Sequence, residues 1–287
     1  MKIAAGIVTY QPNLEKLKRN IAAISGQVDA VYIFDNHSAM IDEICAITGE
    51  RCMVIRSNKN VGIARALNVL AQSAEKDGVD WLLTLDQDSE VFPKLIALYR
   101  NYLDKAASLT CYRKDRNIDA TQEEDDGSHE VPYCITSGNL VNLSVWREIG
   151  GFNERLFIDM VDIDFCFRMT AKGYKILCIH RFGFLHEIGD GSFIKILGKK
   201  RFTGNYSAFR KYYIFRNMAY VIRKYKLHKH YYSYKRLGML FFSILVSEKN
   251  KWNKSKSAVR GFIHSFTQYE YLDGWKLGEE DEEEHAG

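Results

Sequence analysis

An apolar segment that ends in two carboxylates constrains the fold of this chain more than any other feature. Residues 82–85 are Leu-Leu-Thr-Leu, and Asp86, Gln87 and Asp88 follow at once. The segment has the length and composition of a buried β-strand. In an open α/β sheet, residues at the carboxyl ends of strands face the ligand crevice. Two carboxylates at that edge suit Mg²⁺ or Mn²⁺, which prefer oxygen ligands, although an Asp-x-Asp triplet alone is more often a solvated turn.

Strand-like and helix-like segments alternate along the first third of the chain. The predicted strands are residues 2–9, 30–35, 51–56 and 80–85, and the predicted helices are residues 12–24, 39–48 and 62–76. Strands that alternate with helices in this way indicate right-handed βαβ units. We therefore predict an α/β fold with a mostly parallel sheet flanked by helices.

The later segments are more mixed in pattern. We expect helices at 93–104 and 162–172, a helix with Ser144 as its N-cap, and strands at 131–135, 139–143, 175–179 and 182–186. Residues 113–130 are polar and lack apolar periodicity, which predicts a mobile loop. From about residue 204 the pattern is helical, with breaks near 228 and 250. The longest apolar run there, 237–246, is too short to span a bilayer, which requires about 20 residues.

Composition indicates a globular protein with an appended helical region. The chain has 287 residues, of which 46% are hydrophobic and 26% charged, and only 3 prolines. We expect an α/β domain at 1–200, a basic and aromatic helical region at 201–278, and a disordered acidic tail at 279–287. The 6 cysteines form no CxxC pair, and the first residues resemble a strand rather than a signal peptide. Both features indicate a reduced, cytoplasmic protein.

Charge is distributed unevenly along the chain. The formal net charge is +4, and without the six acids at 279–284 the remainder carries +10. Residues 191–261 contain 18 Lys or Arg, 15 aromatic residues and a single acid, Glu248. Such a segment can bind nucleic acid, an anionic membrane surface or a phosphorylated substrate. The alternative is a set of helices with solvated basic faces, which pack on the α/β domain or form a homodimer.

Polar side chains stand at the ends of the early strands, where a ligand crevice is expected. Thr9 and Tyr10 end the first strand, and Asp35 ends the second with an acceptor suited to a base N–H or a ribose hydroxyl. Gly62 begins a predicted helix, permits close backbone approach, and places a helix N-terminus where an anion is favoured. Arg65, one turn into that helix, can contact phosphate.

Taken in order, these motifs resemble glycosyltransferase family 2. The matching segments are Val8-Thr9-Tyr10, residues 35–38, residues 60–68, Leu85-Asp86-Gln87-Asp88, residues 136–139, residues 150–153 and residues 157–168. The resemblance covers about residues 1–190, with a looser likeness at 213–217. The Asp-Gln-Asp triplet and the segment Phe-Ile-Asp-Met-Val-Asp-Ile-Asp at 157–164 are most similar to bacterial rhamnosyltransferases.

The resemblance implies a GT-A fold with 1–200 as the catalytic domain, and an inverting transfer from a nucleoside-diphosphate sugar with Mg²⁺ or Mn²⁺ as cofactor. It also implies roles for residues that match the family's motifs. The donor-binding residues would be Thr9, Tyr10, Asp35, Asn60, Gly62, Arg65, Asp86 and Gln87. The metal ligands would be Asp88, Asp86 and His186, and the residues on the acceptor side would be Ser137, Gly138 and Asn139.

The family further implies a carboxylate that takes the proton from the acceptor hydroxyl. Many members have Glu-Asp at this place, whereas this chain has Val161-Asp162. Asp162 aligns with the usual catalytic aspartate and is the candidate base, with Asp159, three residues earlier, as the rival. Asp164 is expected to pair with Arg168, one turn on. The structural alternative is that these acids start a helix and complement its dipole.

These features predict a transferase that moves L-rhamnose from dTDP-L-rhamnose to a saccharide acceptor in bacterial surface-polysaccharide synthesis, such as that of lipopolysaccharide O-antigen. A UDP-hexose donor, UDP-galactose or UDP-glucose, is the alternative within the family. The acceptor can be linked to polyprenyl diphosphate. Residues 193–262 would then contact anionic lipid peripherally at the inner face of the cell membrane.

Two other classes of protein are disfavoured. A nucleotidyltransferase would have a glycine-rich basic loop after its first strand, where this chain has Thr9-Tyr10-Gln11-Pro12. A nucleotide- or nucleic-acid-binding protein without transferase activity would leave the acidic strand ends unexplained, because carboxylates repel phosphate unless a metal intervenes. No nucleic-acid partner is therefore expected.

Overall fold

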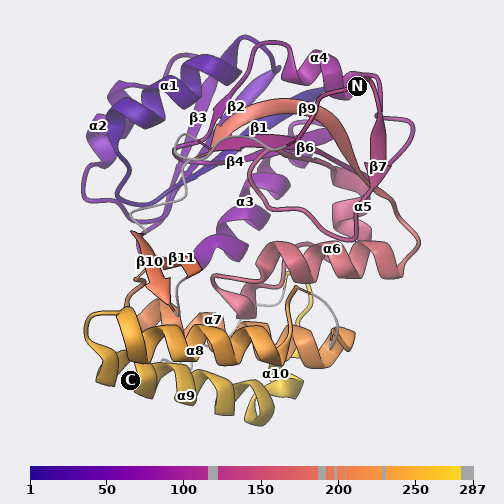
Figure 1. Ribbon diagram of the computed structural model, residues 1–287. Coiled ribbons are helices and arrows are strands. Elements are labelled where there is room, and N and C mark those ends of the chain that lie inside the picture. Colours follow the sequence, from indigo (N-terminus) through magenta and orange to yellow (C-terminus); the bar gives the residue numbers. More distant parts are fainter. Residues whose placement is uncertain (116–121, 187–191, 197–198, 204, 228–230, 279–287) are drawn as a thin grey trace.

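A central β-sheet organises residues 3–186, and helices cover both of its faces (Figure 1). The computed structural model describes residues 1–115, 122–186, 192–196, 199–203, 205–227 and 231–278. Helices α1 (Leu14–Ser25), α2 (Ile41–Ala46) and α4 (Leu95–Arg100) lie on one face, and α3 (Gly62–Lys76), α5 (Leu143–Glu148) and α6 (Val161–Ala171) lie on the other. The α/β class expected from the sequence is confirmed.

The sheet has a parallel half and a mixed half. Its strands are β1 (Ile3–Thr9), β2 (Ala30–Asp35), β3 (Cys52–Arg56), β4 (Trp81–Asp86), β5 (Glu90–Val91), β6 (Ser108–Asp115), β7 (Ser128–Glu130), β8 (Asn139–Asn142) and β9 (Ile176–His186). Their order is β3-β2-β1-β4-β8-β6-β9-β5, with β7 paired to β9. The first four strands are parallel, as predicted. Beyond β4 the sheet is mixed, because β8 runs antiparallel to β4 and β6 while β6 and β9 are parallel.

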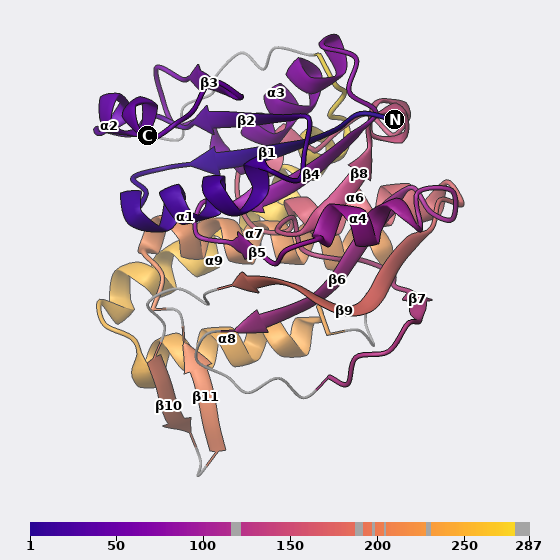
Figure 2. The same ribbon diagram turned by 90° about the horizontal axis from the view of Figure 1, so that it is seen from above.

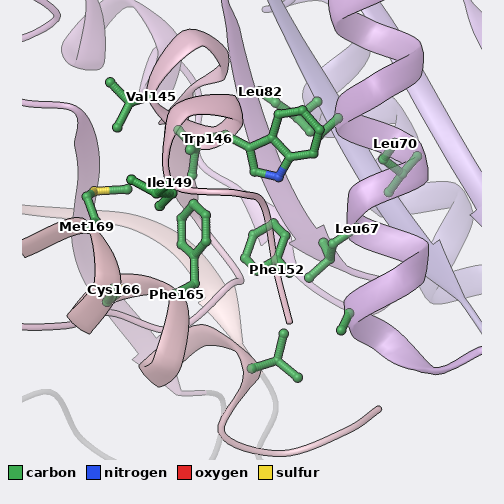
Figure 3. Close-up of a cluster of buried hydrophobic side chains, with 14 of the residues drawn as sticks. Leu67, Leu70, Leu82, Val145, Trp146, Ile149, Phe152, Phe165, Cys166 and Met169 are labelled. Carbon is green, nitrogen blue, oxygen red and sulfur yellow. The ribbon is translucent and has the colours of Figure 1, made fainter. Parts of the chain in front are cut away.

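Apolar layers on both faces hold the helices to the sheet. On the face of α3, α5 and α6, Leu67 packs near Trp146, Phe152 and Phe165 (Figure 3). The rings of Phe152 and Phe165 stack with their centroids 4.2 Å apart. Full burial of each such side chain contributes about 1.5–3 kcal/mol. This packing fixes α6, whose first turn carries the candidate base, against the sheet.

The C-terminal region is a group of helices that follows a β-hairpin. In the described part of the chain these are α7 (Ala208–Tyr225), α8 (Tyr234–Ser247), α9 (Lys251–Thr267) and α10 (Tyr269–Asp273), after β10 (Ser192–Ile196) and β11 (Lys199–Thr203). Helices α7 and α9 approach closely at Gly261, where a Cβ would lie 2.2 Å from the carbonyl oxygen of Tyr212. Among the described residues, no helix is both long and apolar enough to cross a membrane.

Most predicted elements are confirmed, but the segment around residues 108–135 differs. The strand expected at 131–135 is wrong, because the strand in this region is β7, at 128–130. Residues 113–115 of the expected loop extend β6, and residues 116–121 lie outside the described residues. Strand β6 was not predicted from the sequence. Its residues Ser108 and Thr110 are polar but buried, so they do not give the apolar pattern that marks a buried strand.

Several boundaries also differ from the prediction. The two strands expected at 175–179 and 182–186 form one strand, β9, whose pairing with β6 shifts register beside Tyr112. Helix α5 is capped by Asn142 rather than Ser144, because Asn142 Oδ1 accepts the N–H of Ser144 at 3.0 Å. Strand β5 and the β10–β11 hairpin are unpredicted, and the helix expected at 93–104 is limited to α4. The division expected at residue 200 falls inside β11, and the acidic tail lies outside the described residues.

Glu248, the single acid of the basic region, is buried between two lysines. Lys211 Nζ lies 2.6 Å from Glu248 Oε1, and Lys254 Nζ lies 3.0 Å from Oε2. All three side chains are at most 6% exposed. Because Lys211 belongs to α7 and Lys254 to α9, the carboxylate joins these two helices. Removal of the carboxylate would leave the buried ammonium groups of Lys211 and Lys254 without their negative partner. Losing a buried ion pair costs more stability than losing an exposed one.

We predict that Glu248→Gln lowers the free energy of unfolding by about 3 kcal/mol, the lower end of the range for breaking a buried ion pair. Urea denaturation followed by circular dichroism measures the change. Glu270→Gln, which alters an exposed acid of α10, is the matched control and should change the free energy by less than about 0.5 kcal/mol. Equal urea midpoints for both variants and the wild type would show that the ion group does not hold the helices together.

Candidate functional site

The carboxyl ends of β1, β2 and β4 meet at one edge of the sheet. Thr9 pairs with Asp35 in the parallel register of β1 and β2, and Val8 pairs with Asp86 in that of β1 and β4. Strands β1 and β2 run side by side in the same direction (Figure 2). The polar residues that follow these strands therefore lie next to one another, at the place where open α/β sheets bind ligands.

Asp35 is held in a fixed orientation at this edge. Its Oδ1 accepts a hydrogen bond from Thr9 Oγ1 at 2.9 Å, and its Oδ2 accepts one from the N–H of Ser38 at 2.8 Å. Tyr10 is 49% exposed, and its N–H donates to Gln87 Oε1 at 2.8 Å. Two of the expected donor-binding residues therefore differ: Asp35 is a buried, oriented acceptor, whereas Tyr10 is half exposed and offers an aromatic ring that is open to stacking.

Asn36 joins β2 to the start of α3, and sequence reasoning did not select it as a site residue. Its Oδ1 accepts the N–H of Val61 at 2.7 Å, and its Nδ2 donates to Asn60 Oδ1 at 3.0 Å. Asn60 Oδ1 also accepts the N–H of Gly62 at 3.0 Å. Asn60 is exposed, and its side chain holds the segment that enters α3. The place of Asn36 directly after Asp35 is the sequence signal that could have identified it.

Gly62 is required by packing. Its φ is +81°, and a Cβ there would lie 2.6 Å from both the ring Cδ2 and the carbonyl oxygen of Phe157. That carbonyl accepts the N–H of Ile63 at 2.7 Å. The N–H groups of residues 61–63 are therefore all bonded within the protein. This corrects the expectation that the α3 N-terminus offers them to an anion, because each already has an acceptor.

Arg65 lies one turn into α3 and faces Glu154. Its Nη1 is 3.8 Å from Glu154 Oε2, and its side chain is about half exposed. Asn68, on the next turn, donates to Glu154 Oε1 at 2.8 Å and accepts the N–H of Phe152 at the same distance. An exposed ion pair as long as that of Arg65 contributes at most about 1 kcal/mol. The guanidinium can therefore exchange Glu154 for a phosphate at little cost.

Ser137 and Gly138, in the turn before β8, and Asn139, the first residue of β8, lie beside the end of β4. Ser137 Oγ accepts the N–H of Asp86 at 3.3 Å and lies 2.6 Å from Ser89 Oγ. All three residues are buried. Ser137 thereby positions the backbone of Asp86, and the N–H of Gly138 donates to the carbonyl oxygen of Thr84 at 2.9 Å. The place of these three residues on the acceptor side stays a prediction.

The segment between the 3₁₀-helix η1 (Glu154–Leu156) and α6 has an unusual backbone. Phe157, Asp159 and Met160 have φ values of +62°, +65° and +65°. Each such residue costs about 1–3 kcal/mol and persists only where its surroundings hold it. Here the holding group is Asn217 of α7, whose Nδ2 lies 2.7–3.0 Å from three carbonyl oxygens within 156–159. Strain of this kind is typical of functional sites.

Asp159, the rival base, is paired with Arg210. Arg210 Nε and Nη2 donate to the two carboxylate oxygens of Asp159, each at 3.1 Å. Burial acts to lower the pKa of Arg210, but Asp159 and, more weakly, Asp86 raise it above its usual value. Arg210 thus brings a positive charge from α7 to the acidic strand end. Sequence reasoning missed it, because it lies 51 residues from Asp159 and no motif marks it.

Asp162 lies in the first turn of α6 with its side chain partly buried. Burial, followed by the charges of Asp159 and Asp86, raises the pKa of Asp162 to about 7. The N–H of Ile163 opposes this rise by donating to Asp162 Oδ1 at 2.9 Å. The influence of Asp86 means that the end of β4 and the start of α6 converge. A carboxylate with this pKa gains and releases a proton near neutral pH, as a general base must.

The acids at this edge fit a divalent cation as a partial ligand set. Asp86 ends β4 and Asp88 lies in the turn that follows. Within the described ranges, no three His, Cys, Asp or Glu side chains form a preassembled metal site. Mg²⁺ often binds through one or two carboxylates, with water and substrate phosphates as its other ligands, so these donors fit a metal that shares a diphosphate. The side chain of His186, the third expected ligand, lies outside the described residues.

Asp164, two residues after the candidate base, belongs to a separate network. Its carboxylate accepts from Arg168 Nε at 2.8 Å, Lys224 Nζ at 3.2 Å and the Tyr225 hydroxyl at 2.8 Å. Burial acts to raise the pKa of Asp164, but these partners lower it below its usual value. The expected pairing with Arg168 is confirmed. A cavity of about 220 Å³ beside Arg168 and Lys224 contains none of the expected donor, metal or catalytic residues.

We predict that Asp162→Asn stabilises the metal-free protein above pH 7. The folded-state pKa of about 7 exceeds the usual 3.8, so between these values the folded state binds more protons than the unfolded state. Stability therefore falls as pH rises through this window. Removing the carboxylate should add about 1–2 kcal/mol to the free energy of unfolding at pH 8 and almost nothing at pH 4, as measured by urea titration in EDTA.

Asp164→Asn is the matched control for this measurement. It should destabilise the protein at pH 8, because it leaves Arg168 and Lys224 without their buried carboxylate. If Asp162→Asn also destabilised the protein at pH 8, Asp162 would be acting as a helix-terminal acid that complements the dipole, and its assignment as a strained, functional carboxylate would be wrong.

Comparison with known protein sequences agrees with this geometry. The family model described as Glycosyl transferase family 2 matches residues 5–171, which include most of β1, all of β4 and the first turn of α6. The dTDP-rhamnosyl transferase RfbF of Shigella flexneri is 29% identical to this chain over 252 residues. The alignment covers 77% of this chain and 80% of that protein.

Solved structures share the fold at low sequence identity. The crystal structure of S. aureus TarS 1-349 has a TM-score of 0.56 and 13% identity, and the match covers 96% of this chain and 83% of that chain. GalNAc-T7, crystallised with UDP, GalNAc and Mn²⁺, has a TM-score of 0.59 and 13% identity, with coverage of 96% and 58%. The family match spans more than half of the sequence and contains the converging strand ends. This chain therefore belongs to glycosyltransferase family 2 and is a glycosyltransferase with the GT-A fold.

Proposed function

We propose that this chain is an inverting, metal-dependent glycosyltransferase that moves L-rhamnose from dTDP-L-rhamnose to a saccharide acceptor in bacterial surface-polysaccharide synthesis. The observation that carries the catalytic part is the convergence of Asp162 with Asp86 and Asp159, which with burial raises the pKa of Asp162 to about 7. The choice of donor rests on the 29% identity to a dTDP-rhamnosyl transferase over most of both chains.

In the proposed reaction, an acceptor hydroxyl oxygen attacks the anomeric carbon of the donor sugar. The bond from that carbon to the diphosphate oxygen breaks, dTDP leaves from the opposite side, and the configuration inverts. Asp162 takes the proton of the acceptor hydroxyl, because its pKa is close to the working pH. Asp159 is less suited to this role, since both of its oxygens already accept hydrogen bonds from Arg210.

The donor would lie along the edge formed by β1, β2 and β4. The exposed ring of Tyr10 would stack on the base, and the oriented carboxylate of Asp35 would accept from the base or the ribose. Arg65 and Arg210 are the cations that we place at the diphosphate, because guanidinium groups bind phosphate oxygens with paired hydrogen bonds. Binding these groups together aligns the anomeric carbon for attack.

Asp88 and Asp86 are the proposed metal ligands at the end of β4. A bound Mg²⁺ or Mn²⁺ neutralises charge on the departing diphosphate. The Mn²⁺ in the GalNAc-T7 crystal supports this choice for a protein of the same fold. For the acceptor, we propose a saccharide that is carried on a polyprenyl diphosphate.

We predict that Asp162→Asn lowers kcat by about 10²–10⁴-fold, the usual contribution of a general base, while dTDP still binds. Turnover is measured as nucleotide release with acceptor present, and dTDP binding by calorimetry with Mg²⁺. Asp159→Asn is the matched variant and should lower kcat less. If Asp159→Asn reduced kcat more than Asp162→Asn, the base would be Asp159 instead.

We also predict that nucleotide release occurs with dTDP-L-rhamnose but not with UDP-galactose or UDP-glucose, and that EDTA abolishes it. We expect metal dependence because Asp86 and Asp88 are negative, as the diphosphate is, and a divalent cation is needed between them. Restoration of activity by Mg²⁺ or Mn²⁺ is the control for chelation. Release only from a UDP-hexose would overturn the donor, and full activity in EDTA would overturn the metal.

A further inference from the structure

Helices α8 and α9 lie on the side of the C-terminal region that faces away from the sheet (Figure 1). Both helices carry exposed apolar side chains. The exposed apolar residues are Met239, Phe242, Leu245 and Val246 on α8 and Trp252, Val259, Phe262, Ile263 and Phe266 on α9. We call the surface that these residues form the α8–α9 face. Most recur at helical spacings of three, four or seven, so each helix presents one stripe. Trp252 is 81% exposed, and exposed apolar groups that gather in this way mark an interaction surface.

The stripes of the two helices are continuous with each other. The ring centroid of Tyr234, on α8, lies 6.4 Å from that of Phe262, on α9, and Phe262 lies 5.2 Å from Phe266. Ala258 and Gly261 are buried on the opposite side of α9, where that helix packs against α7. The α8–α9 face is therefore the side of the helix pair that the rest of the described residues leave uncovered.

The charges that surround the α8–α9 face are positive. The exposed basic residues on or next to the two helices are Lys235, Lys249, Lys251, Lys256 and Arg260. The one acid between residues 231 and 267 is Glu248, which is buried between Lys211 and Lys254. Within residues 231–267, no exposed carboxylate therefore interrupts the positive charge. Apolar side chains bordered by lysine and arginine are the pattern of helices that lie in a membrane interface.

We propose that the α8–α9 face binds the surface of an anionic bilayer, with both helices lying in the plane of the membrane. A bilayer satisfies both features of the face, because acyl chains accept the apolar side chains and anionic headgroups attract the lysines. A second copy of the chain fits less well, since two positive faces repel each other. Nucleic acid matches the charge but offers no apolar partner to Leu245, Val246 or Ile263.

The purpose of this contact rests on the proposed lipid-linked acceptor, but the contact itself is testable without it. Vesicles that contain neither donor nor acceptor report membrane binding alone, so a failure there leaves the transferase proposal intact. Conversely, the donor assay in solution uses no membrane, and its failure leaves the membrane contact intact.

Vesicle flotation of the full-length protein is the primary test. The protein should float with phosphatidylcholine vesicles that contain about 30% phosphatidylglycerol at about 0.05 M NaCl, and should not float at about 0.5 M NaCl, because salt screens the attraction. It should float poorly with phosphatidylcholine alone. Failure to float with the anionic vesicles at low salt would overturn the proposal.

Paired variants identify the surface. Lys256→Gln with Arg260→Gln should reduce the partition coefficient about thirtyfold, at about fivefold for each charge near an anionic surface. Lys18→Gln with Lys76→Gln, exposed charges on α1 and α3, is the matched control and should leave it unchanged.

A second pair tests the apolar contribution. Val259→Ser with Ile263→Ser should reduce partitioning roughly tenfold. Met53→Ser, an equally exposed apolar residue on β3, is its control and should have no effect. If the control variants weakened binding as much as the double variants of the α8–α9 face, the membrane contact would lie elsewhere on the chain and the proposal would be wrong.

Trp252 provides a second readout. Trp81, Trp146 and Trp275 are less exposed, so a change in tryptophan emission on adding anionic vesicles should come from Trp252. We expect a shift of the emission to the blue, and Trp252→Phe should abolish it.

Light scattering after size-exclusion chromatography tests whether a second copy of the chain covers the α8–α9 face. If the vesicle-free protein were a dimer that Val259→Ser with Ile263→Ser made monomeric, the α8–α9 face would belong to a second copy and the proposal would be overturned.

Discussion

The strained segment at 157–160 is the feature on which the rest of the site depends. The carbonyl of Phe157 accepts a helix-terminal N–H of α3, and its ring occupies the space that Gly62 leaves open. Asn217 of α7 binds the carbonyls on either side of it. One short segment therefore joins three helices from distant parts of the chain. The packing from both directions offsets the cost of its positive φ values and sets where Asp159 and Asp162 stand.

Two aspartates on the same helix acquire opposite properties from this arrangement. The pKa of Asp162 is raised by burial and by the acids at 86 and 159, whereas the pKa of Asp164 is lowered by Arg168 and Lys224 despite burial. Asp164 is consequently a structural anion that holds α6 to α7. Asp162 keeps an unfavourable charge, which is costly for folding and useful for proton transfer. Natural enzymes commonly accept such a cost at the residues that react.

Helix α7 contributes to the site, while α8 and α9 turn outward. Asn217 and Arg210 of α7 reach the segment at 157–160, where Asn217 holds the backbone and Arg210 holds the carboxylate of Asp159. Behind α7, the buried Glu248 joins it to α9 through two lysines. The C-terminal region is thus an integral support for the site. The same scaffold presents basic and apolar side chains on its far side, so a surface contact there would act on helices that are linked to the candidate base.

The sequence by itself determined the strands β1–β4, helix α3, the acids at the end of β4 and the family, because each is written in contiguous residues as an apolar period or an ordered motif. Only the tertiary structure decided that Gly62 leaves room for the ring of Phe157, that Ser137 and Asn139 are buried, and that Arg210 reaches Asp159. The pKa of Asp162 likewise depends on Asp86, far away in the chain. These properties arise from contacts and burial between distant residues, and a one-dimensional pattern does not record which distant side chains meet.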